Sequence, residues 1–168
     1  MKAIRGPRRS FGLIELVIVV VIIGVIAAIA IPRMSHGARN AGANALKANL
    51  QALRTAFERY KAEHEGKSPM LSPAKKLTSF SNLAGTETSP TSDPANGIVY
   101  GPYLRQIPPL PVGSRKGATG IYHFNMNGGS PPGGVATDGW WYSHVGDRIY
   151  ANLPGGEKDD QGVPYNRY

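Results

Sequence analysis

A continuous apolar segment near the N-terminus constrains this chain most. From Leu16 to Ile31 the sequence has sixteen residues without a polar side chain, and the segment 11–31 contains a single charge, Glu15. Folded as an α-helix, such a segment extends about 31 Å, which is the thickness of the hydrocarbon core of a bilayer. We therefore predict a transmembrane helix over 11–32, with the rest of the chain on one side of the membrane.

The residues that precede this segment indicate its orientation. Residues 1–10 contain Lys2, Arg5, Arg8 and Arg9 and no acid. A short basic flank stays in the cytoplasm, so we expect the rest of the chain to be exported. The flank supplies half of the formal net charge of +8, so the basic balance reflects topology and does not predict nucleic-acid binding. The chain has no Cys, which excludes disulfides, Cys nucleophiles and thiolate metal sites.

Three interpretations of the N-terminus differ in how they account for Glu15. In the first, the N-terminus is the secretory signal of an exported enzyme or binding module and is cut after 28–30 (AIA). Its apolar region would then be unusually long and would contain an acid, Glu15. A twin-arginine signal fits 8–11 (RRSF) and leaves the acid unexplained. Cleavage between Ser10 and Phe11 does explain it, because Phe11 then has a free α-amine four residues before a carboxylate that is costly in lipid. The alternative explanation for Glu15 needs no cleavage: its side chain extends to the membrane interface and stays solvated there.

The new amine and Glu15 would also set the register of an assembly. The amine can neutralise the acid of its own chain or of a neighbouring copy, and in a staggered helix bundle insertion is favourable only where amine meets acid. Gly24 and Pro32 lie inside the same apolar helix. Gly has poor helix propensity and Pro lacks a backbone donor, so a kink or a soft segment is predicted between them.

This N-terminal sequence resembles a known family. Residues 10–17 (SFGLIELV), followed by an apolar run that ends in AIAIP, are similar to the prepilin-type cleavage and methylation segment of type IV pilins and type II secretion pseudopilins. The resemblance implies cleavage between Ser10 and Phe11 by prepilin peptidase, and N-methylation of Phe11. The family usually has Gly before the cut, where this chain has Ser10, also a small residue. The residues that the resemblance assigns to assembly are Glu15, Gly24 and Pro32.

After the membrane segment, the sequence predicts an amphipathic stalk helix over 33–66. Apolar residues spaced 4, 3, 4 and 3 apart form one stripe, which we expect to pack against the rest of the chain. Gly66 and Pro69 end this helix. A long loop with a short helix near Leu77–Leu83 is expected over 67–97. The stripe consists of Leu46, Leu50, Leu53, Phe57 and Tyr60.

The C-terminal region 67–168 predicts a small head with three short antiparallel strands. The strand candidates are aromatic-rich and are separated by Gly-rich turns. In the second candidate, Trp140 and Trp141 point to opposite faces of the strand, so one indole is expected in the core and the other is expected to be exposed. A long helix on a small antiparallel sheet gives an α+β fold of the type IV pilin kind. The three strand candidates are Ile121–Asn125, Trp140–Ser143 and Arg148–Asn152.

A second segment refines the resemblance. Residues 101–108 (GPYLRQIP) are similar to a segment of major pseudopilins, and the lack of Cys excludes the C-terminal disulfide loop of pilins. The resemblance implies a filament subunit in the inner membrane with its head in the periplasm. Its partners would be other copies, minor pseudopilins, prepilin peptidase, a platform protein and a motor ATPase, and the filament would drive type II secretion. The alternative is a type IV pilin or competence pseudopilin that acts in adhesion, motility or DNA uptake.

Motifs for catalysis are missing from the sequence. The four His residues include no H-E-x-x-H pair, and there is no phosphate-binding loop and no G-x-S-x-G, so we predict neither an enzyme nor a resident cofactor. His123 and His144 could face each other across adjacent strands, but ordinary surface or cross-strand packing is the favoured interpretation. In the tail, Glu157, Asp159 and Asp160 are weak candidates for calcium ligands, which several related pseudopilins have in this region; a solvated acidic turn is the favoured interpretation.

We expect the mature protein to begin with N-methylated Phe11. Mass spectrometry of the purified chain should show the loss of residues 1–10 and the added methyl group. A chain that begins at Met1 or at Ile31 would contradict this prediction, since the first is unprocessed and the second has lost the apolar helix.

Overall fold

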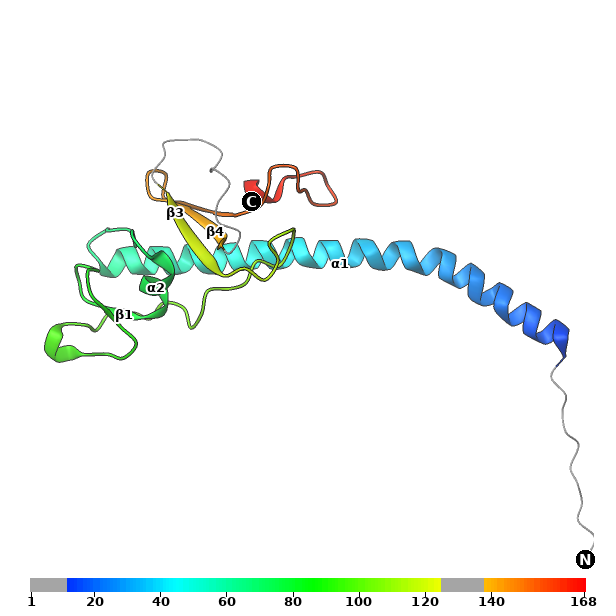
Figure 1. Ribbon diagram of the computed structural model, residues 1–168, viewed down its shortest axis with the longest axis horizontal. Coiled ribbons are helices and arrows are strands. Elements are labelled where there is room, and N and C mark those ends of the chain that lie inside the picture. The colour runs from blue at the N-terminus through cyan, green and yellow to red at the C-terminus, as the bar shows by residue number, and fades with distance from the viewer. Residues whose placement is uncertain (1–11, 125–137) are drawn as a thin grey trace, which may run out of the picture. The chain divides into compact units, whose positions relative to one another are not determined.

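The computed structural model describes residues 12–124 and 138–168, with the backbone alone described for 29–40. The chain divides into two units, Met1–Ala38 and Arg39–Tyr168. A single helix, α1 (Leu13–Glu63), contributes to both units (Figure 1). It is assigned without interruption through Gly24 and Pro32. The kink or soft segment predicted between these residues is therefore not a break in the helix.

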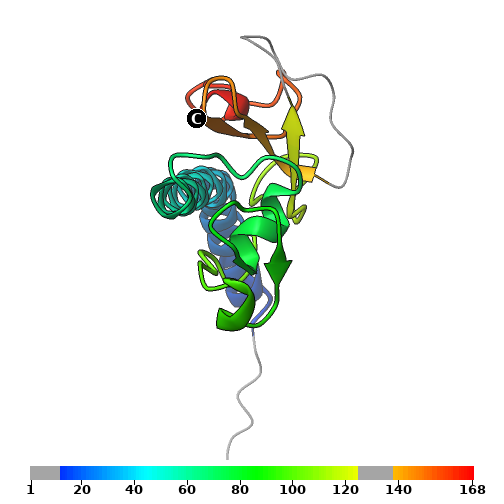
Figure 2. The ribbon, with the colours of Figure 1, turned by 90° about the vertical axis from the view of Figure 1, so that its left-hand side faces the viewer.

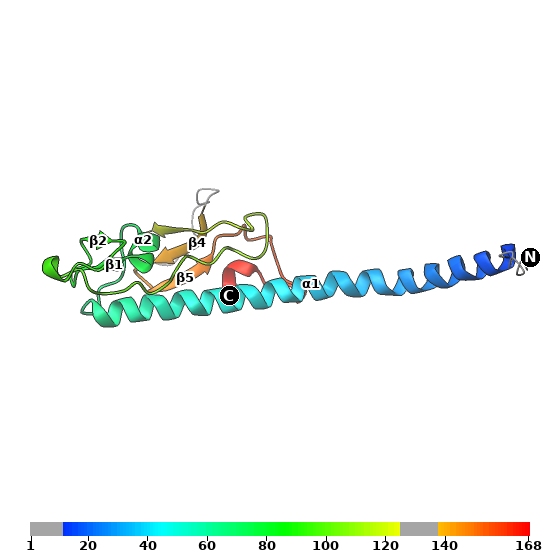
Figure 3. The same ribbon diagram turned by 90° about the horizontal axis from the view of Figure 1, so that it is seen from below.

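In the second unit, α1 provides one wall of the hydrophobic core. The predicted stripe is buried: Leu46, Leu50 and Leu53 are 0% exposed, and Phe57 and Tyr60 are at most 4% exposed. The other elements of this unit lie along one side of the C-terminal part of the helix (Figures 2 and 3). The interpretation of the stripe as the surface on which the head packs is confirmed.

A mixed sheet covers this wall. Among the described residues it has the strand order β3 (Gly120–Phe124), β4 (Asp138–Ser143) and β5 (Arg148–Ala151). β4 and β5 are antiparallel, but β3 and β4 are parallel. The α+β class is confirmed, while the antiparallel pairing predicted for the first two strands is wrong. Parallel neighbouring strands need a long connection, and residues 125–137 link these two strands. The Gly-rich turn signal in the sequence does not distinguish such a connection from a hairpin. Asn125, the predicted end of the first strand, lies outside the described residues.

Both tryptophans of β4 are buried. Trp140 is 0% exposed and its indole N–H donates a hydrogen bond of 2.8 Å to the carbonyl oxygen of Pro108. Trp141 is 5% exposed and its ring lies edge-on to Phe124, with the ring centroids 5.8 Å apart. The prediction that one of the two indoles is exposed is wrong because β4 is the central strand, and its residues from Gly139 to Ser143 are buried on both faces.

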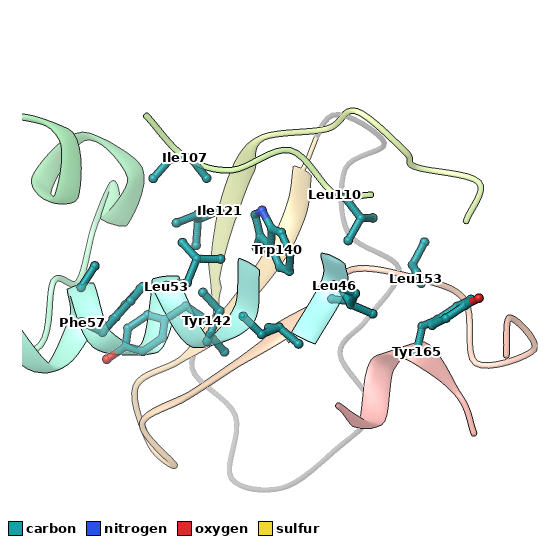
Figure 4. Packing of buried hydrophobic residues seen from close by; sticks show 14 of the residues in the cluster. Leu46, Leu53, Phe57, Ile107, Leu110, Ile121, Trp140, Tyr142, Leu153 and Tyr165 are labelled. Atoms are coloured by element: carbon teal, nitrogen blue, oxygen red, sulfur yellow. The ribbon is translucent and has the colours of Figure 1, made fainter. Parts of the chain in front are cut away.

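Side chains from distant segments meet above α1. In Figure 4, Trp140 of β4 lies between the helix and the segment that carries Ile107 and Leu110, and Tyr142 lies beside Phe57 of the helix. The rings of Phe57 and Tyr142 are in contact, with centroids 4.3 Å apart. Stripe residues such as Leu50 are fully enclosed by these contacts. Because close packing of apolar side chains holds the elements together, the stripe is the main attachment of the head to the helix.

The segment between α1 and the sheet contains more structure than a loop. Its helix, α2, starts at a proline, a residue favoured at the first helical position. The helix predicted near Leu77–Leu83 is therefore misplaced, and the strands that follow it are not predicted at all. The short elements are α2 (Pro73–Thr78), the antiparallel pair β1 (Phe80–Ser81) and β2 (Thr88–Ser89), and the 3-10 helices η1 (Pro94–Asn96) and η2 (Tyr165–Arg167).

The turn between β4 and β5 is tied to the end of α1 by Asp147. Its carboxylate accepts hydrogen bonds from Lys61, from the Tyr142 hydroxyl at 2.9 Å and from the Ser68 hydroxyl at 3.4 Å. Partial burial alone would raise the pKa of Asp147, but the hydrogen bonds from Lys61 and Tyr142 outweigh it and lower the pKa. The carboxylate therefore stays ionised and holds the turn against the helix.

Replacing Leu50 by Ala should remove about 2–5 kcal/mol of the free energy of unfolding, because it empties a fully enclosed position between helix and sheet. Chemical denaturation of the full-length chain in detergent micelles, followed by tryptophan fluorescence, measures the change. The matched control is Gln51→Ala, on the exposed face one residue away, which should change the stability by no more than about 0.5 kcal/mol. Equal effects of the two substitutions would contradict the assignment of the stripe.

Candidate assembly site

The first unit presents an uncovered apolar surface. α1 begins after Gly12, whose carbonyl oxygen accepts hydrogen bonds from the backbone N–H groups of Glu15 and Leu16 at 3.1 and 3.3 Å. From Leu13 to Ile26 the large apolar side chains are between 42% and 82% exposed. A surface of this kind, so much larger than the scattered apolar residues of a soluble protein, marks a site of contact with lipid or with other chains.

Glu15 is the acidic residue in the first turn of α1. A carboxylate at this position is stabilised by the partial positive charge of the helix N-terminus. The side chain is exposed at the start of the apolar surface. Ser10 and Phe11 lie outside the described residues, so both the cleavage between them and the pairing of the Phe11 amine with Glu15 stay predictions.

Gly24 has open space around it. A Cβ built at this position meets no described heavy atom within 4 Å outside the helix backbone next to it. A larger side chain at residue 24 would therefore fit within the described part of the chain, and a requirement for Gly would have to come from a neighbouring molecule. The backbone of Pro32 belongs to α1, but its side chain lies outside the described set. The assembly roles of both residues stay predictions.

Within the part of the chain that the structure describes, no helix is both long enough and apolar enough to cross a membrane. The membrane span predicted over 11–32 includes residues 11 and 29–32, whose side chains lie outside the described set. The span stays a prediction.

Within the head, the segment 101–108 contacts both α2 and the end of α1. The backbone N–H groups of Tyr103 and Leu104 both donate to the carbonyl oxygen of Leu77, each at 2.9 Å. The Tyr103 hydroxyl donates to the carboxylate of Glu63 at 2.6 Å, and burial together with this hydrogen bond raises the pKa of Tyr103. Its ring also lies edge-on to that of Tyr60, with centroids 5.5 Å apart. The segment therefore fastens α2 and the last turns of α1 to each other.

Two of the three calcium candidates have structural roles in the tail. Glu157 accepts a hydrogen bond from the backbone N–H of Ser114 at 2.9 Å. Asp159 accepts backbone N–H groups of Gln161 and Val163 at 2.9 and 2.8 Å, and also the hydroxyl of Tyr168. Among the described residues, no group of three or more His, Asp or Glu side chains is arranged to hold a metal. A calcium site at Glu157, Asp159 and Asp160 stays a prediction.

Tyr168 attaches the tail to α1, which the sequence does not signal. The hydrogen bond to Asp159 raises the pKa of Tyr168 to about 12. Its backbone oxygen accepts a hydrogen bond of 2.9 Å from Arg54, and the Lys47 ammonium lies 4.8 Å from the centre of its ring. A lone aromatic residue in an aperiodic tail carries no pattern that would have identified this contact.

His123 of β3 and His144, the residue that follows β4, are in contact. His123 Nε2 lies 2.9 Å from His144 Nδ1, and the ring centroids are 4.9 Å apart. In the parallel pair β3–β4, His123 is the register partner of Tyr142, and His144 comes one residue after the end of β4. Both rings are partly exposed.

Comparisons with known proteins agree with the N-terminal pattern. A family model described as the prokaryotic N-terminal methylation motif matches residues 5–31. Over this segment the chain is similar to proteins that carry the N-terminal methylation motif.

Two characterised relatives come from different branches of the pilin-like proteins. The type II secretion system core protein G of Klebsiella pneumoniae is 28% identical over 108 residues, which cover 64% of this chain and 71% of that protein. The type IV major alpha-pilin of Moraxella bovis is 34% identical over 94 residues, which cover 56% of this chain and 57% of the pilin, little more than half its length. Among solved structures no match was found.

Proposed function

We propose that this pilin-like chain is a pseudopilin: a subunit that is anchored in the inner membrane, with its head in the periplasm, and that polymerises into a helical filament. The observation that carries the proposal is the exposed apolar surface of α1 from Leu13 to Ile26, with an acid in the first turn and a methylation motif around it. Such a surface needs lipid before assembly and like helices after it. The role is structural, with other pilin-like subunits as partners.

The acid supplies selectivity in this scheme. A carboxylate inside a membrane helix costs about 2.5–3.5 kcal/mol on insertion scales unless it has a partner. Processing before Phe11 creates a cation four residues from Glu15, and methylation keeps that cation charged. A copy that enters the filament in register brings its amine to the acid of its neighbour, so the pairing favours one axial position over the others.

Two observations support the type II secretion branch. The alignment with the secretion protein G covers 71% of that relative. The segment 101–108, which resembles a segment of major pseudopilins, forms the attachment between α2 and α1 described above. In this branch the filament grows on an inner-membrane platform protein, driven by a motor ATPase, after prepilin peptidase has processed the subunits, and it pushes folded proteins out of the periplasm. Minor pseudopilins would share the filament.

A second candidate function is that of a type IV pilin or a competence pseudopilin. The higher identity, 34% over 94 residues, to the Moraxella pilin favours it. Both candidates use the same assembly surface. They differ in what the filament does, since a pilus displays fibres at the cell surface whereas a secretion pseudopilin acts inside the envelope.

Replacing Glu15 by Val tests the proposal. The change makes the helix more apolar, so membrane insertion should be unaffected, whereas assembly should fall by at least tenfold because the amine of a neighbour no longer finds an acid. Cells that produce the variant in place of the natural chain should retain in the periplasm the proteins that they otherwise export. Membrane fractionation, filament recovery and the extracellular protein profile are the three measurements.

The control is Glu58→Gln, which removes an exposed acid of the same helix that pairs with Lys61 at 3.3 Å. It should leave all three measurements unchanged. Normal filaments from Glu15→Val would contradict the pairing mechanism. Loss of surface fibres with an unchanged extracellular profile would identify the chain as a type IV pilin instead.

A further inference from the structure

The His123–His144 pair belongs to the second unit, residues 39–168, and is not part of the assembly surface of α1. Two imidazole nitrogens that face each other at 2.9 Å share one proton, with one ring donating and the other accepting. Each ring therefore directs a nitrogen lone pair or an N–H group at the same small region. Imidazole nitrogen is also a frequent ligand of divalent transition metals in proteins.

The separation of the two nitrogens defines which ion fits. Metal–imidazole bonds are about 2.0–2.1 Å long, and two donors 2.9 Å apart then subtend about 90° at a shared ion. That is the angle between neighbouring ligands in square-planar or tetragonal coordination, which Cu²⁺ and Ni²⁺ prefer. Tetrahedral Zn²⁺ would require the rings to separate further. The partly exposed rings leave the remaining positions of the ion to water.

The surroundings of His123 disfavour its protonated form. Burial, and after it the charges of His144 and Lys76, lower the pKa of His123, so its ring is neutral at pH 7. Lys76 belongs to α2, which packs against β3, and burial lowers the pKa of this lysine as well. The lysine opposes an incoming cation, which limits the affinity of the site.

We propose that His123 Nε2 and His144 Nδ1 form a chelating site for Cu²⁺ or a similar tetragonal divalent cation. On binding, the proton that lies between the rings moves to the other nitrogen of the donor ring, so that each imidazole stays neutral and gives one lone pair to the ion. The ion ties the ends of β3 and β4 together at the edge of the sheet where both parallel strands finish. This lies beyond the filament role and does not depend on it.

The test uses the full-length chain in detergent micelles, without a histidine tag, titrated with Cu²⁺ at pH 7. Electron paramagnetic resonance of the unsubstituted chain should show one tetragonal Cu²⁺ per molecule, with superhyperfine splitting from two nitrogens. This measurement decides the matter without any variant. A spectrum without two nitrogen ligands, or no stoichiometric binding, overturns the proposal.

Variants provide a second, independent readout. His123→Gln and His144→Gln keep a hydrogen-bonding side chain but lose the imidazole, so each should weaken Cu²⁺ binding at least tenfold. His36→Gln, which removes an imidazole outside the pair, should bind within twofold of the unsubstituted chain. Saturating Cu²⁺ should raise the thermal midpoint of the unsubstituted chain and of His36→Gln, and leave the midpoints of the other two unchanged. Equal affinity in all four proteins would overturn the proposal.

Discussion

An apolar surface that its own chain leaves exposed governs how this protein can exist. Burying one large aliphatic side chain is worth about 1.5–3 kcal/mol, and the side chains from Leu13 to Ile26 are 42–82% exposed. The hydrophobic free energy left unused is therefore large compared with the net stability of an ordinary domain. Lipid or a bundle of similar helices can supply the missing cover. A filament subunit that leaves the lipid and enters such a bundle covers the same apolar residues first with lipid and then with neighbouring helices.

The C-terminal part of the same helix has a different task. There the apolar residues are confined to one stripe, and the head covers that stripe with β4 and the segment around Leu110. Polar contacts then fix the head in place: Asp147 ties the β4–β5 turn to Lys61, and Tyr103 reaches Glu63. The head thus has a core of its own that includes helix residues, and its fold depends on contacts made within residues 39–168.

Features with a strong period or a local motif could be predicted from the sequence. The stripe from Leu46 to Tyr60 and the α+β class follow from spacing and strand pattern. The parallel pairing of β3 and β4 could not be predicted, because strand direction depends on where a Gly-rich connection leads and not on its composition. The burial of Trp141 depends in the same way on β4 being central. The contacts of Tyr168 and Asp147 involve residues with no local signal.

Assembly requires that the apolar helices of neighbouring copies lie side by side, staggered so that residue 11 of one meets Glu15 of the next. Residues 18 and 22 lie seven positions further along, on the same helix faces as residues 11 and 15, so the same offset sets residue 18 of one copy against residue 22 of another. Because the chain has no Cys, two forms carrying Ile18→Cys and Ile22→Cys can be produced together and oxidised within assembled filaments. Covalent dimers that form only when both variants are present are the predicted result. Intact filaments that yield only monomers under these conditions would contradict the account.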